Sequence, residues 1–394
     1  MNKFVYMDNA ATTMIRPEVL EEMLPFLKGD FANPASHYKF SASPFEAVNQ
    51  ARRKAAKVLN ADEKEIYFTS GGTEADNWAI RGIAEAHAHK GKHIISTAFE
   101  HHALLHSCKS LEKKGFEVTY LRPDEKGYIS AADVEKAIRP DTILISVIFA
   151  NNEIGTIQPI EEIGAAARKH NIVFHTDAVQ AVGHIPVDVK KMNIDLLSLS
   201  AHKFYGPKGA GALYIRKGVK IAPLFYGGMQ ELNKRAGTHN VPGIVGLGKA
   251  IELAWSEMDQ EAVKVAALRD RLINGILNEI PHADVNGGLK NRLPGNVNVA
   301  FRFIESESIL NMLDLKGICA SSGSACNSDS LDPSHVLLSI GVNHERANGS
   351  VRFSLGRYNT EEEIDFVVSE LKPVIEWLRN MSPLYEDFVK AGKD

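Results

Sequence analysis

The chain has 394 residues, with 45 Lys and Arg against 49 Asp and Glu, and a formal net charge of -4. This near balance gives no electrostatic basis for binding nucleic acid or an anionic membrane. The sequence has no targeting signal and no apolar run near the ~20 residues of a membrane span, and its three cysteines include no CxxC pair. We therefore expect a cytoplasmic protein without a metal site.

Apolar runs rich in β-branched residues alternate with amphipathic segments from about residue 64 to residue 216. The apolar runs predict strands, and spacings of three and four residues between apolar positions predict helices. The predicted strands are 65–70, 93–98, 117–121, 142–149, 172–177, 195–200 and 211–216, and the predicted helices are 73–90, 101–114, 130–138 and 159–170. This alternation is typical of an α/β fold with a mostly parallel sheet between helices.

The pattern changes after Pro242. Residues 244–279 have a helical pattern that is broken near Met258, and they are followed by predicted strands at 295–303 and 349–356 and a closing helix at 361–381. A single core rarely grows beyond about 250–300 residues, so we expect two domains. We place a large domain at 16–257 and a small domain at 1–15 and 258–394.

Three polar elements follow predicted strand ends in the large domain. A strand ends before Gly71 and Gly72, and the helix after them begins at Thr73, which is an arrangement that binds anions. Asp177 ends another strand, where it could pair with a ring nitrogen or cap a helix. Lys203 follows a third strand at the sheet rim; it is either a surface lysine or an amine whose pKa is lowered by desolvation.

In this order, the three elements resemble the fold-type I pyridoxal 5′-phosphate (PLP) enzymes of aminotransferase class V, and within them the NifS/IscS-type cysteine desulfurases. The similar segments span nearly the whole chain, and AHKFYGPKG and SSGSAC are the most specific of them. The others are YMDNAATT, NPASHY, TSGGTEADN, EHHA, NNEIGTIQPI, HTDAVQAVGHIPVD, RAGTHNVPGI and VRFSLGR. The resemblance implies a large domain with a seven-stranded sheet and a smaller α+β domain.

The resemblance also implies a role for each matching residue. Lys203 would hold PLP as a Schiff base, and Asp177 would pair with the pyridine nitrogen. His101, rather than its neighbour His102, would stack on the ring and move protons. Further cofactor contacts would come from Asn152 and Gln180 at the phenolate oxygen, from Gly72, Thr73, Ser200 and His202 at the phosphate, and from Thr238 of the second subunit of a homodimer.

Arg352 is similar to the arginine that binds the substrate carboxylate in this family, with Asn152 beside it. A guanidinium group suits a carboxylate, although an arginine in a strand is more often structural, and Arg357 is the competing candidate. His239, Met229 and Leu232 depart from the family pattern next to Thr238. These departures fall beside the cross-subunit phosphate contact that the resemblance implies, so they bear on the dimer geometry and on the role of Thr238.

Cys326 lies in a run of small polar residues, ASSGSACNSDSLDPSH, which predicts an exposed loop where a thiol can ionise. Cys108 and Cys319 lie in or beside apolar stretches, so we expect both to be buried. By resemblance, Lys203 would remove the α-proton of L-cysteine and Cys326 would attack the substrate sulfur. The products would be alanine and a Cys326 persulfide, whose sulfur passes to an acceptor for iron–sulfur cluster assembly or thiolation.

Two other functions remain open at this point. The first is a selenocysteine lyase or another class V β-elimination enzyme, which turnover of cysteine and selenocysteine by a Cys326→Ala variant would distinguish. The second is an inactive scaffold with the fold of a PLP enzyme. The presence of Lys203, Asp177 and Cys326 together argues against a scaffold.

Overall fold

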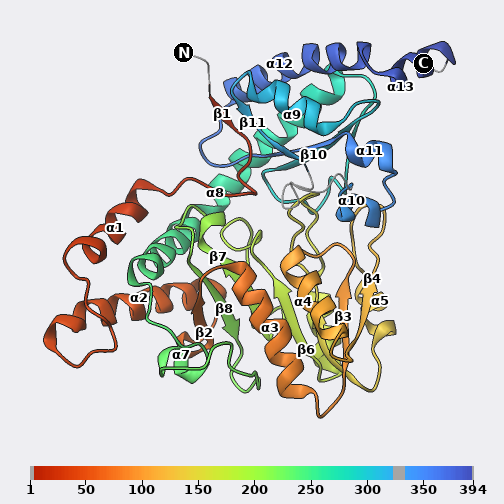
Figure 1. The fold of residues 1–394 in the computed structure, drawn as a ribbon. Coiled ribbons are helices and arrows are strands. Elements are labelled where there is room, and N and C mark those ends of the chain that lie inside the picture. The colour runs from red at the N-terminus through yellow and green to blue at the C-terminus, as the bar shows by residue number, and fades with distance from the viewer. Residues whose placement is uncertain (1–3, 323–332, 393–394) are drawn as a thin grey trace.

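The computed structural model describes residues 4–322 and 333–392. A seven-stranded sheet forms the centre of its larger part (Figure 1). The strands are β2 (Ile66–Thr69), β3 (His93–Thr97), β4 (Glu117–Leu121), β5 (Thr142–Ser146), β6 (Val173–Asp177), β7 (Leu196–Ser200) and β8 (Gly211–Ile215). Their spatial order is β2-β8-β7-β6-β5-β3-β4, and β8 is antiparallel to both of its neighbours. The predicted α/β fold with a mostly parallel sheet is therefore confirmed.

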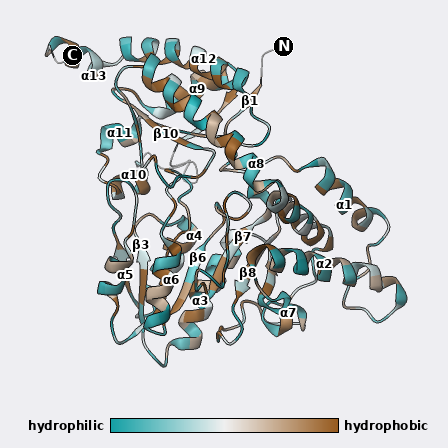
Figure 2. Ribbon diagram, turned by 180° about the vertical axis from the view of Figure 1, so that it is seen from behind, coloured by the Kyte–Doolittle hydropathy of each residue, from teal (hydrophilic) through white to brown (hydrophobic). Residues whose placement is uncertain are grey.

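Helices cover this sheet because parallel strands need long crossover connections. The four predicted helices are present and begin and end within a few residues of their predicted bounds: α3 (Gly72–His87), α4 (His102–Glu112), α5 (Ala131–Ala137) and α6 (Ile160–Lys169). Figure 2 shows hydrophobic residues along the strands and hydrophilic residues on the outer helices. The core of this part of the molecule is thus the sheet together with the helix faces that pack on it.

Two helices that were not predicted project from one side of the molecule (Figure 1). They are α1 (Pro17–Lys28) and α2 (Ala42–Leu59), and both pack on α8. In α2 the buried residues Val48, Ala51, Ala55 and Leu59 have the spacing of one helix face. Short elements complete this region: η1 (Lys39–Ser41), η2 (Glu63–Glu65), η3 (Ala201–Lys203) and α7 (Gln230–Asn233).

The helix α8 (Val241–Glu279) runs without interruption for 39 residues, so the predicted break near Met258 is wrong. The side chain of Asn240 accepts a hydrogen bond from the Gly243 N–H at 3.2 Å and caps the helix start. The first half of α8 packs in the core of the large sheet up to Ala254, and the second half packs in another core from Val265 onward. The helix therefore connects two separate hydrophobic cores.

The second core surrounds a four-stranded antiparallel sheet of spatial order β12-β13-β10-β9. These strands are β9 (Ala283–Val285), β10 (Asn296–Phe301), β12 (Ser321–Ser322) and β13 (Ser350–Ser354). The helices of this region are α9 (Ser306–Asp314), α10 (His335–Ser339), α11 (His344–Asn348), α12 (Glu361–Asn380) and α13 (Pro383–Lys390). A capping box between Thr360 and Glu363 begins α12, as the predicted closing helix requires.

The N-terminal segment joins the two parts. The strand β1 (Val5–Tyr6) pairs in parallel with β11 (Ile318–Cys319) beside the smaller sheet. A few residues later, Thr13 Oγ1 donates a hydrogen bond to the His202 carbonyl of the larger part at 3.0 Å. The polar residues between these contacts therefore cross from one core to the other. In the part of the chain that the structure describes, no helix combines the length and the apolar character needed to cross a membrane.

Candidate active site

The turn between β2 and α3 has the features of an anion site. Gly71 has φ +155°, and α3 begins at Gly72. A Cβ atom on Gly72 would lie 2.6 Å from Cγ2 of Val179, so the chain that follows β6 approaches too closely for any larger residue. The first-turn N–H groups and the dipole of the 16-residue helix α3 favour a phosphate at this point.

Two of the predicted phosphate ligands, Ser200 and Thr73, lie at this turn, and a third, His202, contacts the N-terminal segment. Ser200, the buried last residue of β7, has its Cβ 3.8 Å from the position of a Cβ on Gly72. Thr73 is exposed in the first turn of α3. His202 Nδ1 lies 3.1 Å from Thr12 Oγ1, and burial and the charge of Lys203 lower the pKa of His202 to about 4. The imidazole of His202 is therefore a neutral group near pH 7.

Lys203 extends toward the N-terminal segment. Its Nζ donates hydrogen bonds to the carbonyl oxygens of Ala10 and Ala11, at 2.5 and 2.8 Å. Gln180 Nε2 donates to the same Ala10 carbonyl at 2.9 Å. The segment DNAATT therefore lies directly against the predicted cofactor lysine. Lys203 is partly buried and is not the solvated surface lysine that was the alternative.

Asp177 is buried at the end of β6. Its Oδ1 accepts a hydrogen bond from the Val179 N–H at 2.9 Å, but residues 179–184 form turns, so the helix-cap interpretation is wrong. Burial raises the pKa of Asp177 to about 6, while the Val179 N–H and the charge of Lys203 act in the opposite direction. The positive charge of Lys203 thus acts on the carboxyl of Asp177, as expected for two groups of one site.

His101 is the N-cap of α4, and its Nδ1 accepts a hydrogen bond from the Ala103 N–H at 3.2 Å. Burial and the charge of Lys203 lower the pKa of His101 to about 4, so the ring is neutral near pH 7 with its proton on Nε2. His102 packs instead against His335, with ring centroids 4.6 Å apart. The positive charge of Lys203 contributes to the lowered pKa of His101 but not to that of His102. This difference supports His101, rather than His102, as the histidine beside Lys203.

Arg352 comes from β13 in the smaller sheet and is buried. Its Nη1 donates to the Asn152 carbonyl at 3.1 Å, and its Nη2 donates to Oδ1 of Asp8 at 2.9 Å. The guanidinium thus joins β13 to the loop after β5 and to the N-terminal segment. The competing candidate Arg357 forms ion pairs with Glu257 at 2.6 Å and with Glu261. Arg357 is therefore a structural residue beside α8.

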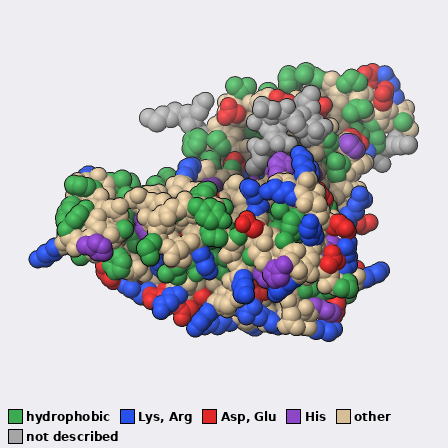
Figure 3. All heavy atoms as spheres, turned by 60° about the horizontal axis from the view of Figure 1, so that its bottom comes forward, with side chains coloured by type: hydrophobic (Ala, Val, Ile, Leu, Met, Phe, Trp, Pro, Cys, Tyr) green, Lys and Arg blue, Asp and Glu red, His purple; other side chains and the backbone are tan. Residues whose placement is uncertain are grey.

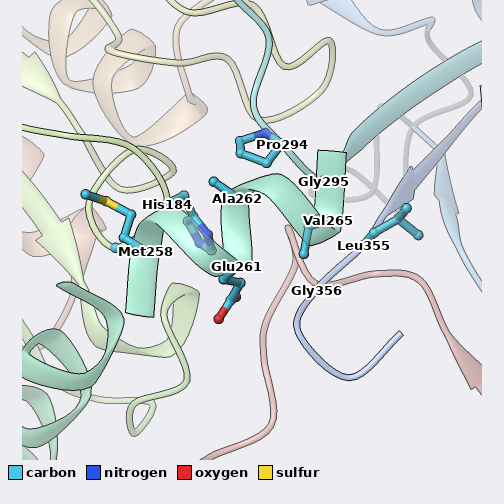
Figure 4. A pocket seen from close by; sticks show the side chains of 10 residues that line it. His184, Met258, Glu261, Ala262, Val265, Pro294, Gly295, Leu355 and Gly356 are labelled. Carbon is cyan, nitrogen blue, oxygen red and sulfur yellow. The ribbon is translucent and has the colours of Figure 1, made fainter. Parts of the chain in front are cut away.

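A crevice borders the site where the two cores meet. Its lining comes from α8, the chain before β10 and the chain after β13, and Figure 4 shows Met258, Glu261, Pro294 and Leu355 around it. His184 also lines this crevice, and its Nε2 is 2.8 Å from the Lys203 carbonyl. A neighbouring hollow shares His184 and is also lined by Ala10 and Gln180, and the Ala10 carbonyl accepts hydrogen bonds from both Gln180 and Lys203.

The structure does not bring Thr238 into this group. Thr238 is exposed, although its neighbour Arg235 donates to Glu74, in the first turn of α3, at 2.8 Å. Of the residues that depart from the family pattern, Met229 and Leu232 are exposed. His239 has a structural role, because its Nε2 lies 2.7 Å from Oε1 of the buried Glu231.

Cys326 lies outside the described residues. Cys108 is buried, and burial raises the pKa of its thiol to about 12. Cys319 is only partly buried, so the prediction of burial is confirmed for Cys108 alone. The segment after the undescribed residues is anchored by Ser334, whose Oγ donates to Oε2 of Glu153 at 2.5 Å.

The sequence analysis missed several residues of the site. Asp8, Ala10 and Ala11 contact Arg352 and Lys203, but they lie far away in the sequence, and only the DNAATT match pointed to them. Two buried residues beneath the site could have been found from periodicity. Asp76 follows Gly72 by four positions and shares its helix face, and His175 precedes Asp177 by two and shares its strand face.

PLP fits this set of groups. The helix N-terminus and Ser200 suit its phosphate, the buried carboxyl of Asp177 suits a ring nitrogen, and the amine of Lys203 suits an aldehyde carbon. His101 provides a flat neutral ring beside the same lysine. An anion cradle, a buried acid and an amine are thus present within one site, in the order that the sequence predicted.

Comparisons with known proteins agree with this chemistry. The family model described as aminotransferase class V matches residues 5–367. A cysteine desulfurase IscS from Clostridium botulinum is 60% identical over 396 residues, with 100% of each chain covered. A solved NifS-like protein is 40% identical with a TM-score of 0.90, covering 95% of this chain and 100% of its own. A structure of SspA in complex with cysteine is 41% identical with a TM-score of 0.81, covering 90% of this chain and 100% of its own.

Proposed function

The chain belongs to aminotransferase class V and is a PLP-dependent cysteine desulfurase of the IscS type, and from this premise we propose that Cys326 receives the sulfur of L-cysteine as a persulfide. One observation carries the assignment of the site: Asp177 ends β6, Lys203 follows the neighbouring strand β7, and the positive charge of Lys203 acts to lower the pKa of Asp177. Bound PLP supplies an electron sink for the substrate Cα. Side chains of this protein carry out the proton transfers, the substrate binding and the attack on sulfur.

Lys203 holds the cofactor and then serves as the base that takes the α-proton of the substrate. Its contacts with the Ala10 and Ala11 carbonyls support this role, because they keep the amine directed into the site. Asp177 holds a proton on the pyridine nitrogen. His101 stays neutral, as its low pKa indicates, and it can stack on a ring without adding a positive charge beside Lys203.

The sulfur transfer conserves atoms and electrons. The Cys326 thiolate attacks the sulfur of L-cysteine, the bond between that sulfur and the substrate Cβ breaks, and the electron pair returns to Cβ. Protonation of Cβ, together with return of the α-proton from Lys203 to Cα, then gives L-alanine, and Cys326 carries the added sulfur. The cysteine bound in the structure of the SspA relative supports L-cysteine as the ligand of this class of site. We propose that a sulfur-acceptor protein, for cluster assembly or thiolation, receives the persulfide sulfur.

Arg352 binds the substrate carboxylate, with Asn152 beside it. The existing contacts of Arg352 support this role, because the Asn152 carbonyl and Asp8 hold the guanidinium in one orientation between the two cores. A fixed guanidinium loses little conformational freedom when a carboxylate binds. Gln180 and Asn152 contribute hydrogen bonds to the phenolate oxygen of the cofactor.

We further propose that the enzyme is a homodimer in which Thr238 reaches the phosphate of the other subunit. Large hydrophobic side chains support this proposal: Phe31, Tyr226 and Met229 are 74%, 80% and 79% exposed. Figure 3 shows hydrophobic side chains on the side of the molecule where α1 and α2 project. Exposed apolar surface of this kind is typical of subunit contacts. Sedimentation velocity tests the proposal, and a monomer at micromolar concentration would refute it.

The division into a large domain at 16–257 and a small domain at 1–15 and 258–394 is also proposed. The change of core along α8, between Ala254 and Val265, supports a boundary in that interval. A location in the cytoplasm stays a prediction from the sequence.

Replacement of Cys326 by alanine tests the function. We expect the Cys326→Ala variant to bind PLP normally and to lose sulfide release from L-cysteine in the presence of a thiol reductant. Cys108→Ala is the matched control, because the buried Cys108 thiol has a pKa of about 12 and cannot serve as a nucleophile. Full desulfurase activity in the Cys326→Ala variant would contradict the persulfide step.

A further inference from the structure

Three buried carboxyl groups occur at the candidate site. Asp76 of α3, Glu100 before α4 and Asp177 at the end of β6 are 1%, 0% and 4% exposed. The charge of Asp177 raises the pKa of both Asp76 and Glu100, and the charge of Glu100 also raises that of Asp76. We call these three residues the carboxyl cluster. The role of Asp177 toward PLP leaves Asp76 and Glu100 without an assigned function.

The members of the cluster differ in what stabilises a negative charge. Asp177 has the Val179 N–H on Oδ1 and feels the positive charge of Lys203. Glu100 Oε1 accepts hydrogen bonds from the Thr97 hydroxyl at 2.7 Å and from the Ile148 N–H at 2.8 Å. Among the residues that the structure describes, however, Glu100 Oε2 and Asp76 Oδ1 have no hydrogen-bond partner.

A histidine lies next to Asp76, but it cannot balance a negative charge. His175 Nε2 is 3.7 Å from Asp76 Oδ1, beyond hydrogen-bond distance. The ring bridges two neighbouring strands, with Nδ1 2.8 Å from Ser146 Oγ and Nε2 3.0 Å from Ser198 Oγ. Complete burial lowers the pKa of His175 to about 3, so the imidazole is neutral near pH 7.

The charges that act on the cluster therefore favour a single ionised carboxyl. The titratable and charged groups that face Asp76 are Asp177 and Glu100, which repel a negative charge, and the neutral His175. Lys203 faces Asp177 from η3. Burial and the two neighbouring carboxyls raise the pKa of Asp76 well above its ordinary value, and the Ser198 hydroxyl only partly offsets them. Asp177 is therefore the carboxyl of the cluster whose ionisation requires the least free energy.

We propose that Asp76 keeps its proton in the working enzyme and, as a neutral acid beside His175 and Ser198, positions Asp177 as the ionised carboxylate of the site. Ser198 is the link, because it pairs in register with Asp177 across β6 and β7. Asp76 is a positioning residue and does not itself touch the cofactor. The inference rests on the proposed role of Asp177 toward PLP, which a separate variant tests.

The test uses two substitutions at position 76. Asp76→Asn preserves the shape of a neutral acid, whereas Asp76→Leu has similar size and makes no hydrogen bond. We expect Asp76→Asn to bind PLP within about twofold of the unmodified protein and Asp76→Leu to bind at least about tenfold more weakly. Titration of the apo-protein with PLP, followed by visible absorbance, measures both. Weakening of about tenfold or more in the Asn variant would overturn the proposal, because it would mean that a charge at position 76 is required.

A spectroscopic measurement reads the proton directly. In infrared difference spectra of the holoenzyme, we expect the carbonyl band of a protonated carboxylic acid to lose intensity in Asp76→Asn. Unchanged intensity would overturn the proposal even if PLP binding is normal. Asp177→Asn provides the separate test of the premise: if this variant binds PLP as the unmodified protein does, the role of Asp177 fails, while the infrared result at position 76 still reports the protonation state of Asp76.

Discussion

Replacing Arg352 with lysine removes one of the two hydrogen bonds that hold this side chain between the cores. The guanidinium contacts the Asn152 carbonyl at 3.1 Å and Asp8 at 2.9 Å at the same time, and an ammonium group cannot keep both contacts and also bind a carboxylate through two N–H groups. Loss of one hydrogen bond to a charged group costs ~1.5–3 kcal/mol, which corresponds to about 10- to 100-fold in binding.

We therefore expect Arg352→Lys to raise the KM for L-cysteine by about 10- to 100-fold, with a smaller change in kcat, because the carboxylate contact is the same in the ground state and the transition state. Alanine formation at varied L-cysteine concentration is the assay. Arg357→Lys is the matched control, since Arg357 pairs with Glu257 and Glu261 outside the site. An unchanged KM in Arg352→Lys, or an equal rise in Arg357→Lys, would refute the assignment.

Three further predictions concern the cofactor and stability. Lys203→Ala should abolish the visible absorbance of lysine-bound PLP while the exposed Lys208→Ala keeps it; the reverse would mean that Lys203 is not the anchor. Arg52→Ala should lower the free energy of unfolding in urea by ~3–5 kcal/mol, because it leaves the buried Glu231 carboxylate without its ion pair at 2.6 Å; a loss below about 1 kcal/mol would show that the pair is unimportant. Burial raises the pKa of Glu100 from 4.5 to about 8, so the folded state holds this proton more tightly and loses that stability as the pH rises through about 8. As the pH rises from 5 to 8, Glu100→Gln should therefore gain stability relative to the unmodified protein, as measured by urea titrations. If the difference in the free energy of unfolding between the two proteins stays constant over this range, the raised pKa of Glu100 is contradicted.

The strands of the large sheet could be predicted from the sequence because each is a short apolar run between polar turns. The prediction failed in α8, where the apolar periodicity lapses near Met258 although the helix continues. The physical reason is that α8 leaves one core at Ala254 and enters another at Val265, so the residues between them face neither core. A pattern of burial along one helix cannot distinguish a change of core from a break in the backbone.

The site shows a similar division between local and distant information. Asp177 and Lys203 follow strand ends, and the strand pattern alone brought them into one region. The contact of Lys203 with Ala10 and Ala11 joins residues that are more than 190 positions apart, and no local pattern predicts it. Gly72 was predicted as a phosphate glycine, but the structure adds a second reason for it, the approach of Val179.

The central claim is that the sulfur of L-cysteine passes through Cys326. Mass analysis of peptides after incubation of the PLP-loaded protein with L-cysteine, without reductant, tests this claim most directly. We predict one added sulfur atom on the peptide that contains Cys326 and none on the peptide that contains Cys108. Added sulfur on another cysteine, or formation of alanine without any modified Cys326 peptide, would contradict it.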